Sequence, residues 1–267
     1  MPFFKLLLSC LVLMGLSGCD SPPKHPERAG IALSFDDHFL KEWTELIPLF
    51  RKYNAKVTFF INCPDSLSTE DITLLKQLQN EGHEIGYHGT IHGVSTQMIQ
   101  DLGVDGYLHT EIRPGLSYLN KAGFYPTSYA HPGGNHNARV DSVLLASGFQ
   151  ILRDVALAER SYKGFRLYHI PPKYLPQIYY DFDQERVVDA LLIDYSANLS
   201  SEEMKDVLKK AKAKGKAVML FGHEPLTAPP TATQYGFDIA FLEEILTTAL
   251  ELNLKFYRMS DLPKVRN

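Results

Sequence analysis

The sequence predicts an α/β domain built on a parallel sheet or barrel. Short apolar strands alternate with amphipathic helices along most of the chain. The strands are almost continuously hydrophobic, as is typical of parallel strands buried on both faces. In addition, polar side chains follow four of the expected strands. Because catalytic groups lie at the C-terminal strand ends of such folds, this second pattern also predicts an active site.

The composition limits the classes of function. The chain has 267 residues, of which 45% are hydrophobic, so one large domain or two small ones can form a substantial core. The formal net charge at pH 7 is −4. The sequence has no basic cluster suited to a phosphate backbone, and we therefore expect no nucleic acid partner.

The N-terminus predicts a lipoprotein signal peptide. Residues 6–16 are apolar but too few to span a bilayer, and Leu16-Ser-Gly-Cys19 follows them. This motif resembles the bacterial lipobox, which implies cleavage before Cys19 and lipidation of its thiol. We therefore expect a signal peptide over residues 1–18, an extended linker over residues 19–30 and one globular domain over residues 31–267. The alternative is an ordinary secretory signal with an incidental cysteine.

These features predict a location in the cell envelope. A lipid on Cys19 would anchor the protein to a membrane, facing the periplasm or the exterior. Cys10 would leave with the signal peptide, so Cys63 would have no partner for an intramolecular disulfide. Cys63 closes an apolar strand, where a buried small hydrophobe is expected rather than a nucleophile. We expect the protein to be a monomer.

The expected elements follow from the two hydrophobic periodicities. Alternating or continuous apolar runs predict strands over residues 31–35, 56–63, 83–88, 127–131, 149–155, 217–221 and 254–259. Apolar positions three and four apart predict helices over residues 42–53, 68–80, 96–102, 110–122, 138–147, 200–214 and 237–252. Residues 186–193 fit either type, and residues 161–184, rich in Tyr, Phe and Pro, are strand-like or irregular.

Local signals support several of these helices. Ser68 with Asp71, and Ser200 with Glu203, have the spacing of capping boxes. Pro48 predicts that the first helix is kinked or begins later.

Adjacent carboxylates at the end of the first strand suggest a metal site. Asp36 and Asp37 repel each other if both are charged away from water, and a divalent cation removes that cost. His88 and His92 follow the third strand, and both imidazoles can face one cation if the second lies in a turn. Two histidines and one carboxylate leave open positions on a metal. We expect Zn²⁺ first, while Co²⁺, Ni²⁺ or Fe²⁺ would also fit.

The remaining groups suggest hydrolysis. The second carboxylate can accept a proton as a general base. His223, at the end of a later strand, can donate one to a leaving group, although a strand-end histidine can also be a core residue. Together these groups suit metal-assisted hydrolysis of an amide or ester.

The motifs resemble those of a known family. Ser-Phe-Asp36-Asp37 is followed by Gly-His-Glu-Ile-Gly-Tyr-His88-x-x-x-His92, a Pro-Gly loop and Phe-Gly-His223. In this order they resemble the polysaccharide deacetylases of carbohydrate esterase family four, the NodB homology group. The resemblance covers about residues 31–262. It implies a distorted (β/α) barrel of about seven parallel strands and removal of acetyl groups from a polysaccharide, which we expect to contain N-acetylglucosamine.

The resemblance also implies roles for the site residues. Asp36 matches the general base and His223 the general acid. Asp37, His88 and His92 match the metal ligands, so that metal-bound water would attack the acetyl carbonyl.

Further positions follow from the same resemblance. Gly133, after Pro132, matches the residue whose backbone N–H stabilises the oxyanion together with the metal. Phe221 and Leu220 would line the pocket for the acetyl methyl group. Tyr129 would contact a sugar ring, although strand tyrosines usually serve packing.

The sequence departs from the family pattern at three points. Gly89 stands where the family usually has Ser or Thr after the first histidine. Ala130 stands where the family has an arginine that orients the base, and we expect Arg153 to replace it; the alternative is a surface pair of Arg153 with Asp154. The family's tryptophan motif is not evident, and Trp43 is expected to pack a helix.

Two other functions compete with deacetylation. A catalytically silent glycan-binding module on the same barrel would agree with the arginine missing at Ala130, but it would not need the five acidic and histidine residues of the site. A metal-dependent hydrolase of small cyclic amides is usually cytoplasmic, which the lipobox opposes.

Overall fold

The structure is a computed structural model that describes residues 25–156, 159–162, 165–231 and 234–265. The expected signal peptide, Cys19 and most of the linker lie outside the described residues. Among the described residues, no helix combines the length and the apolar character that crossing a membrane requires. A short 3₁₀ turn, Pro26–Arg28, leads into the first strand.

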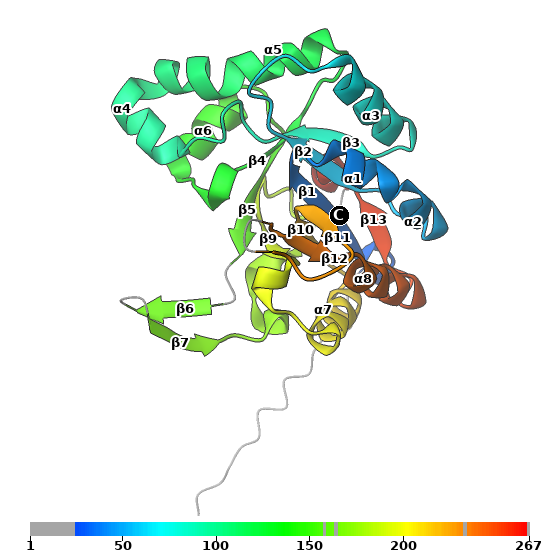
Figure 1. The fold of residues 1–267 in the computed structure, drawn as a ribbon. Coiled ribbons are helices and arrows are strands. Elements are labelled where there is room, and N and C mark those ends of the chain that lie inside the picture. Colours follow the sequence, from blue (N-terminus) through cyan, green and yellow to red (C-terminus); the bar gives the residue numbers. More distant parts are fainter. Residues whose placement is uncertain (1–24, 157–158, 163–164, 232–233, 266–267) are drawn as a thin grey trace, which may run out of the picture.

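Seven parallel strands close into a barrel, which confirms the fold implied by the family resemblance (Figure 1). Around the barrel they are β1 (Gly30–Asp37), β2 (Thr58–Ile61), β3 (Glu84–Tyr87), β4 (Ser128–Ala130), β5 (Ile151–Ala156), β9 (Val187–Leu192) and β10 (Ala217–Gly222). Six residues of β10 pair with β1 and close the ring. By contrast, β3 and β4 pair at a single position, Tyr87 with Tyr129, so the barrel is distorted at this seam.

Short strands extend this framework. β13 (Lys255–Tyr257) runs parallel to the start of β1, and β8 (Tyr179–Tyr180) runs antiparallel to β10. Two small separate sheets join β11 (Glu224–Leu226) to β12 (Gly236–Asp238) and β6 (Glu159–Tyr162) to β7 (Phe165–His169). The β6–β7 hairpin projects away from the barrel (Figure 1). Residues 187–192, which fitted helix or strand by pattern, form a barrel strand.

Helices cover the outside of the barrel. They are α1 (Leu40–Glu45), α2 (Ile47–Lys52), α3 (Thr69–Asn80), α4 (Ser95–Tyr107), α5 (Arg113–Lys121), α6 (Ala138–Ala146), α7 (Ser201–Lys214) and α8 (Ile239–Glu251). Both predicted capping boxes are present, at Ser68 and Ser200. Each cap stabilises its helix by about 1 kcal/mol, because it satisfies backbone N–H groups that have no partner within the helix.

Three helices differ from their expected extents. The first is divided at Leu46, one residue before α2, in agreement with the break that Pro48 predicts. Compared with the expected pieces at residues 96–102 and 110–122, α4 is longer and α5 is shorter, and a π-helical turn, Leu108–Ile112, joins the two. Gly103, with φ of 72°, interrupts the helical backbone within α4.

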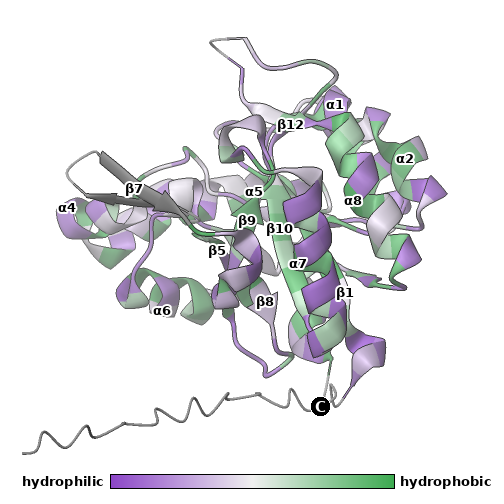
Figure 2. Cartoon of the chain, turned by 90° about the horizontal axis from the view of Figure 1, so that it is seen from below, coloured by the Kyte–Doolittle hydropathy of each residue, from purple (hydrophilic) through white to green (hydrophobic). Residues whose placement is uncertain are grey.

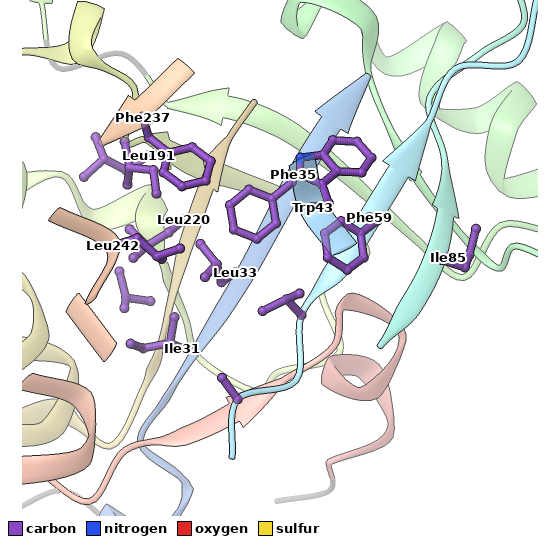
Figure 3. Close-up of a cluster of buried hydrophobic side chains, with 14 of the residues drawn as sticks. Ile31, Leu33, Phe35, Trp43, Phe59, Ile85, Leu191, Leu220, Phe237 and Leu242 are labelled. Atoms are coloured by element: carbon purple, nitrogen blue, oxygen red, sulfur yellow. The ribbon is translucent and has the colours of Figure 1, made fainter. Parts of the chain in front are cut away.

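Side chains of the barrel strands divide between two apolar layers, because neighbours along a strand point to opposite faces. The inner layer fills the barrel with Ala32, Phe60, Ala130, Ile151, Val188, Ala190, Ala217, Met219 and Phe221. The outer layer packs against the helices and includes Ile31, Leu33, Phe35, Phe59, Leu220 and Leu242 (Figure 3). In Figure 2, hydrophobic β1 and β10 lie behind α7, whose exposed side is hydrophilic.

Candidate active site

The polar strand ends meet at one rim of the barrel, as parallel strands require. Asp36 points inward and is buried, with 2% of its surface exposed. Asp37 is the last residue of β1 and has a positive φ of 87°. This left-handed conformation is uncommon for a residue with a side chain, and it turns the second carboxylate toward the same cleft. Both carboxylates therefore reach the cleft although they are neighbours in a strand.

Asp37, His88 and His92 form a group suited to a divalent cation. The Oδ1 atom of Asp37 lies 3.6 Å from Nε2 of His88 and 3.7 Å from Nε2 of His92. These separations are too long for hydrogen bonds. They leave room between the three atoms for a cation with bonds of about 2.0–2.2 Å. One carboxylate and two imidazoles are a donor set that Zn²⁺ accepts, so the residues fit the expected metal.

The surroundings of His88 prepare it to bind a cation. Its Nδ1 lies 2.9 Å from the backbone oxygen of Ala130. Since a carbonyl only accepts, Nδ1 carries the hydrogen, and the lone pair of Nε2 points toward Asp37. Burial lowers the pKa of His88 to about 4, although Asp36 and Asp37 act in the opposite direction. The ring is therefore neutral near pH 7, which is the form that ligates a metal.

Asp36 is paired with Arg153. The guanidinium of Arg153 is 1% exposed, and its Nη2 donates to Oδ2 of Asp36. It also lies 4.3 Å from the ring centroid of Phe221 and 5.5 Å from that of Phe60. Burial alone would raise the pKa of Asp36, but Arg153 in particular, with His88 and His223, holds this pKa below its ordinary value. Asp36 is therefore ionised at neutral pH, as a base must be.

His223 is oriented by a second carboxylate. Its Nδ1 lies 2.6 Å from Oδ2 of Asp194, and its backbone N–H donates to Oδ1 of the same side chain at 3.1 Å. The indole N–H of Trp43 donates to the backbone oxygen of His223 at 2.9 Å. Burial lowers the pKa of His223, but Asp194 and then Asp36 raise it, and the net shift is upward. The ring thus keeps its proton to a higher pH than a free imidazole.

The loop after β4 borders the metal-binding group, because Ala130, the last residue of β4, contacts the ring of His88 through its backbone oxygen. Pro132 is buried and begins a 3₁₀ turn, Pro132–Gly134. Gly133 is exposed, with φ of 58°, and a side chain there would meet no atom within 4 Å. This residue therefore offers its backbone at the surface of the cleft.

Comparisons with known proteins agree with the family resemblance. The family model described as polysaccharide deacetylase matches residues 24–152, from the start of the described chain into β5. This chain is therefore similar to the polysaccharide deacetylase family over nearly its N-terminal half. A curated relative, the peptidoglycan-N-acetylglucosamine deacetylase of Bacillus cereus, is 31% identical over 121 residues, which are 45% of this chain. The chain spans about half of that relative's length, 54%.

Solved structures of family members share the fold over nearly the whole chain. A putative polysaccharide deacetylase from Mycobacterium smegmatis superposes with a TM-score of 0.60 at 15% identity, covering 91% of this chain and 92% of its own. The chitin deacetylase of Colletotrichum lindemuthianum gives 0.57 at 14% identity, with coverage of 90% and 89%. At these identities the likeness concerns the fold alone.

Two of the expected substrate contacts are wrong. Leu220 precedes Phe221 in β10 and therefore points outward, where it is fully buried beside Leu242 (Figure 3). Only Phe221 faces the interior and can border the pocket. Tyr129 is likewise fully buried in the outer layer, with its ring 5.5 Å from that of His131, so it cannot contact a sugar.

The departures from the family pattern have structural explanations. Arg153 pairs with Asp36, and the alternative pairing with Asp154 is wrong because the two side chains point to opposite faces of β5. Gly89 has φ of +86°, and an added Cβ would lie 2.0 Å from Oε1 of Glu111. Ser or Thr at this position would therefore displace the carboxylate of Glu111.

Glu111 is one of three residues near the site that sequence reasoning missed. This fully buried carboxylate accepts N–H groups from Ile91 and Gly93, on either side of His92. Asp194 lies two residues after β9 and would have been found by the strand-end rule, had that segment been assigned as a strand. Tyr235 donates to Oδ2 of Asp37 at 2.7 Å from a loop without any periodic signal.

Cys63 behaves as a buried hydrophobe. It is a free, fully buried cysteine of the outer layer. Burial raises the pKa of its thiol to about 11, so the reactive thiolate is scarce at neutral pH. The side chain is thus unsuited to nucleophilic catalysis.

Proposed function

We propose that this protein is a metal-dependent deacetylase that hydrolyses the acetamide groups of an N-acetylglucosamine-containing polysaccharide. The observation that carries the proposal is the convergence of three units at one barrel rim. These are the Asp37, His88 and His92 group, the ionised Asp36, and His223, whose raised pKa favours its protonated form. A glycan-binding module would need no base and acid prepared in this way.

Asp37, His88 and His92 would hold the cation. A divalent cation bound there supplies Lewis acidity, which polarises the acetyl carbonyl and makes water more acidic. Tyr235 fixes the carboxylate of Asp37 from its other oxygen. The backbone N–H of Gly133 is proposed to donate to the carbonyl oxygen as negative charge develops on it.

Asp36 and His223 would move the protons. Asp36 accepts a proton from the attacking water, whose oxygen bonds to the acetyl carbon. His223 gives its proton to the amide nitrogen as the carbon–nitrogen bond breaks, and the products are acetate and a free amine. Transfer of the proton from Asp36 to His223, directly or through water, restores both groups. Arg153 and Asp194 do not react; they set the charge states of the base and the acid.

Two observations support an amide substrate on a polymer. The curated relative, 31% identical over 121 residues, is a peptidoglycan-N-acetylglucosamine deacetylase. In addition, the site is open at the rim, since 42% of the His92 side chain and 19% of the His223 side chain are exposed. An open site can receive a residue within a long chain.

The substrate class is tested by acetate release. The zinc-loaded full chain is incubated with N-acetylglucosamine oligomers and with acetylated xylan. We expect acetate from the oligomers at a rate at least tenfold above that from xylan. Release from xylan alone would replace the amide substrate by an ester, and release from neither polymer, with the cation bound, would favour the silent glycan-binding module.

We also propose that the protein is a membrane-anchored lipoprotein of the cell envelope. The proposal rests on the lipobox at residues 16–19 and the proline-containing linker that follows it. In a bacterial host, the chain should incorporate labelled fatty acid and fractionate with membranes. A Cys19→Ala variant should do neither. Membrane association and labelling that persist in this variant would contradict the proposal.

A further inference from the structure

A second group of histidines and carboxylates lies outside the barrel, behind the Pro132–Gly134 turn. His131 follows β4, His136 follows the turn, and Asp141 is on the first turns of α6. Asp154 is on β5, where Arg153 points into the barrel and Asp154 therefore points outward. The group thus connects two strands, a loop and a helix. It lies on the outer face of the strands, whereas Asp36 and Arg153 of the proposed catalytic cleft point into the barrel.

Three ligand atoms converge in this group. The Oδ1 atom of Asp141 lies 3.2 Å from Nε2 of His131 and 3.0 Å from Nδ1 of His136. The two imidazole rings are stacked, with centroids 4.7 Å apart. The three donor atoms all lie within 4.8 Å of one another, as in the Asp37, His88 and His92 group. Separations near 3 Å correspond to ligands about 90° apart around a cation with bonds of about 2.1 Å.

The environment of His131 points independently to a ligand. Its side chain is fully buried, yet neither ring nitrogen has a hydrogen-bond partner among the described residues. The Oδ1 atom of Asp141 lies 3.2 Å from Nε2, at ion-pair distance. A buried polar group without a hydrogen bond costs about 1–3 kcal/mol, and such groups in native proteins often mark an ion site. Coordination of Nε2 would give one of the two ring nitrogens a partner.

His136 has the arrangement typical of a metal-bound histidine. While Nδ1 faces Asp141, Nε2 lies 2.6 Å from Oδ2 of Asp154. Ligating histidines usually donate their other N–H to a carboxylate, which fixes the tautomer and the ring orientation. The rival arrangement, an imidazolium between two aspartates, would explain His136 but would leave His131 with only the contact to Asp141, which His136 already occupies.

The local charge also favours a cation. Asp189 on β9 is the register partner of Asp154, so the two carboxylates are side by side on the outer face. With Asp141, three acidic side chains surround two imidazoles. The strongest nearby cation, Arg153, points to the other side of β5 and pairs with Asp36.

We propose that His131, His136 and Asp141 bind a second divalent cation of the Zn²⁺ class, with Asp154 positioning His136. This site is separate from the Asp37, His88 and His92 group, and its ligands do not contact the reacting atoms. Its ligands lie on both sides of the Pro132–Gly134 turn, so a bound cation ties that turn to α6 and keeps the backbone of Gly133 in place.

Metal counting on the full chain tests the proposal without any measurement of activity. The chain is stripped with a chelator, titrated with Zn²⁺, and its bound zinc is counted after dialysis. We expect two equivalents for the natural chain. The near-isosteric Asp141→Asn variant should bind one, whereas the control variant His109→Ala, which changes an exposed histidine outside both groups, should still bind two. A natural chain that binds one equivalent would overturn the proposal.

A complementary variant covers the possibility that Asp141→Asn does not fold. The double variant His88→Ala/His92→Ala removes the ligands of the first group and leaves the second group intact. We expect it to retain one equivalent of zinc and to gain thermal stability when zinc is added. A folded double variant that binds no zinc would equally overturn the second site.

Discussion

Neighbouring side chains in the site differ in charge state because their surroundings differ. Asp36 is buried but faces Arg153, so it stays ionised without contacting solvent. Asp37 leaves the strand through a positive φ and turns toward His88 and His92. Two chemically identical carboxylates can thus serve as base and ligand, since one is held by a guanidinium and the other faces two imidazoles.

Removing Arg153 should change the pH dependence of activity. In an Arg153→Met variant, Asp36 stays buried but loses its counter-charge, so its pKa rises and the base becomes protonated at a higher pH. We expect the acidic limb of the kcat/KM profile to move upward by about 1–3 pH units. Circular dichroism would establish that the variant folds. An unchanged profile and turnover in a folded variant would refute the role of Arg153.

Removing the carboxylate of Asp194 should move the alkaline limb of the kcat/KM profile. His223 acts while protonated, and its raised pKa extends the active range to higher pH. In Asp194→Asn the carboxylate that raises this pKa is absent, so the proton is lost at a lower pH and the alkaline limb moves downward. We also expect kcat to fall about 10²-fold, because the acid is less often in its working form. If the alkaline limb stays in place, His223 is not the acid.

At the scale of elements, the loop after β3 depends on a close contact. Glu111 lies on the π-helical turn between α4 and α5 and supports the backbone on both sides of His92. The loop can approach this carboxylate only because residue 89 has no side chain. The loop and the helical turn therefore form one structural unit that sets the geometry of the metal ligands.

Gly89→Ala should disrupt this unit, and Gly123→Ala is a matched control. Both glycines have positive φ, of 86° and 91°, so both substitutions carry the cost of about 1 kcal/mol for a left-handed residue. Only at position 89 does the new methyl group meet an atom, Oε1 of Glu111. Urea denaturation should show that Gly89→Ala costs about 2 kcal/mol more than Gly123→Ala. It should also weaken zinc binding. Equal costs would show that the contact with Glu111 is relaxed easily.

The sequence predicted those helices and strands that are marked by a pattern within a few neighbouring residues. Hydrophobic periodicity located the barrel strands except β9, which fitted helix or strand, and the spacing of Ser and acidic residues located two helix caps. Asp36, Asp37, His88, His92 and His223 were found because each follows a strand that the pattern identifies. The β11 and β12 strands, by contrast, are three residues each and show no periodicity.

The sequence-based predictions of the site failed where a residue's role depends on the direction of its side chain or on a partner far away in the sequence. Leu220 was placed in the pocket because it adjoins Phe221, although strand geometry sends neighbours to opposite faces. The pairing of His223 with Asp194, which was missed, spans 29 residues of sequence, and that of Tyr235 with Asp37 spans 198. Such contacts depend on how the whole barrel closes, which no local pattern contains.

At the scale of the molecule, one end of the barrel carries the proposed active site and the other end carries a buried hydrogen-bond network. The C-terminal rim holds the charged groups of the proposed chemistry. The opposite end is closed by the segment Met259–Lys264 and by Glu84, a buried carboxylate at the start of β3. Glu84 accepts hydrogen bonds from the hydroxyls of Thr58 and Ser128 and from the backbone N–H of Ser260. It thereby ties three segments together far from the catalytic rim.

Glu84→Ala should therefore lower stability while leaving the chemistry intact. Three buried donors would lose their acceptor, and we expect the free energy of unfolding to fall by about 3–5 kcal/mol. The kcat of the molecules that remain folded should stay within about twofold of the natural value, since the site lies at the other rim. Urea denaturation combined with active-site counting would separate the two effects. A loss below about 1 kcal/mol would show that the network is solvated.

The central claim is that Asp36 is the base beside a cation held by other residues. Asp36→Asn keeps the shape of the side chain but removes its ability to take a proton. The measurement is acetate release from N-acetylglucosamine oligomers, with bound zinc counted on the same sample. We expect the variant to bind zinc at Asp37, His88 and His92 as the natural chain does, and to release acetate at least about 10²-fold more slowly. Acetate release at the natural rate from the zinc-loaded variant would contradict the mechanism.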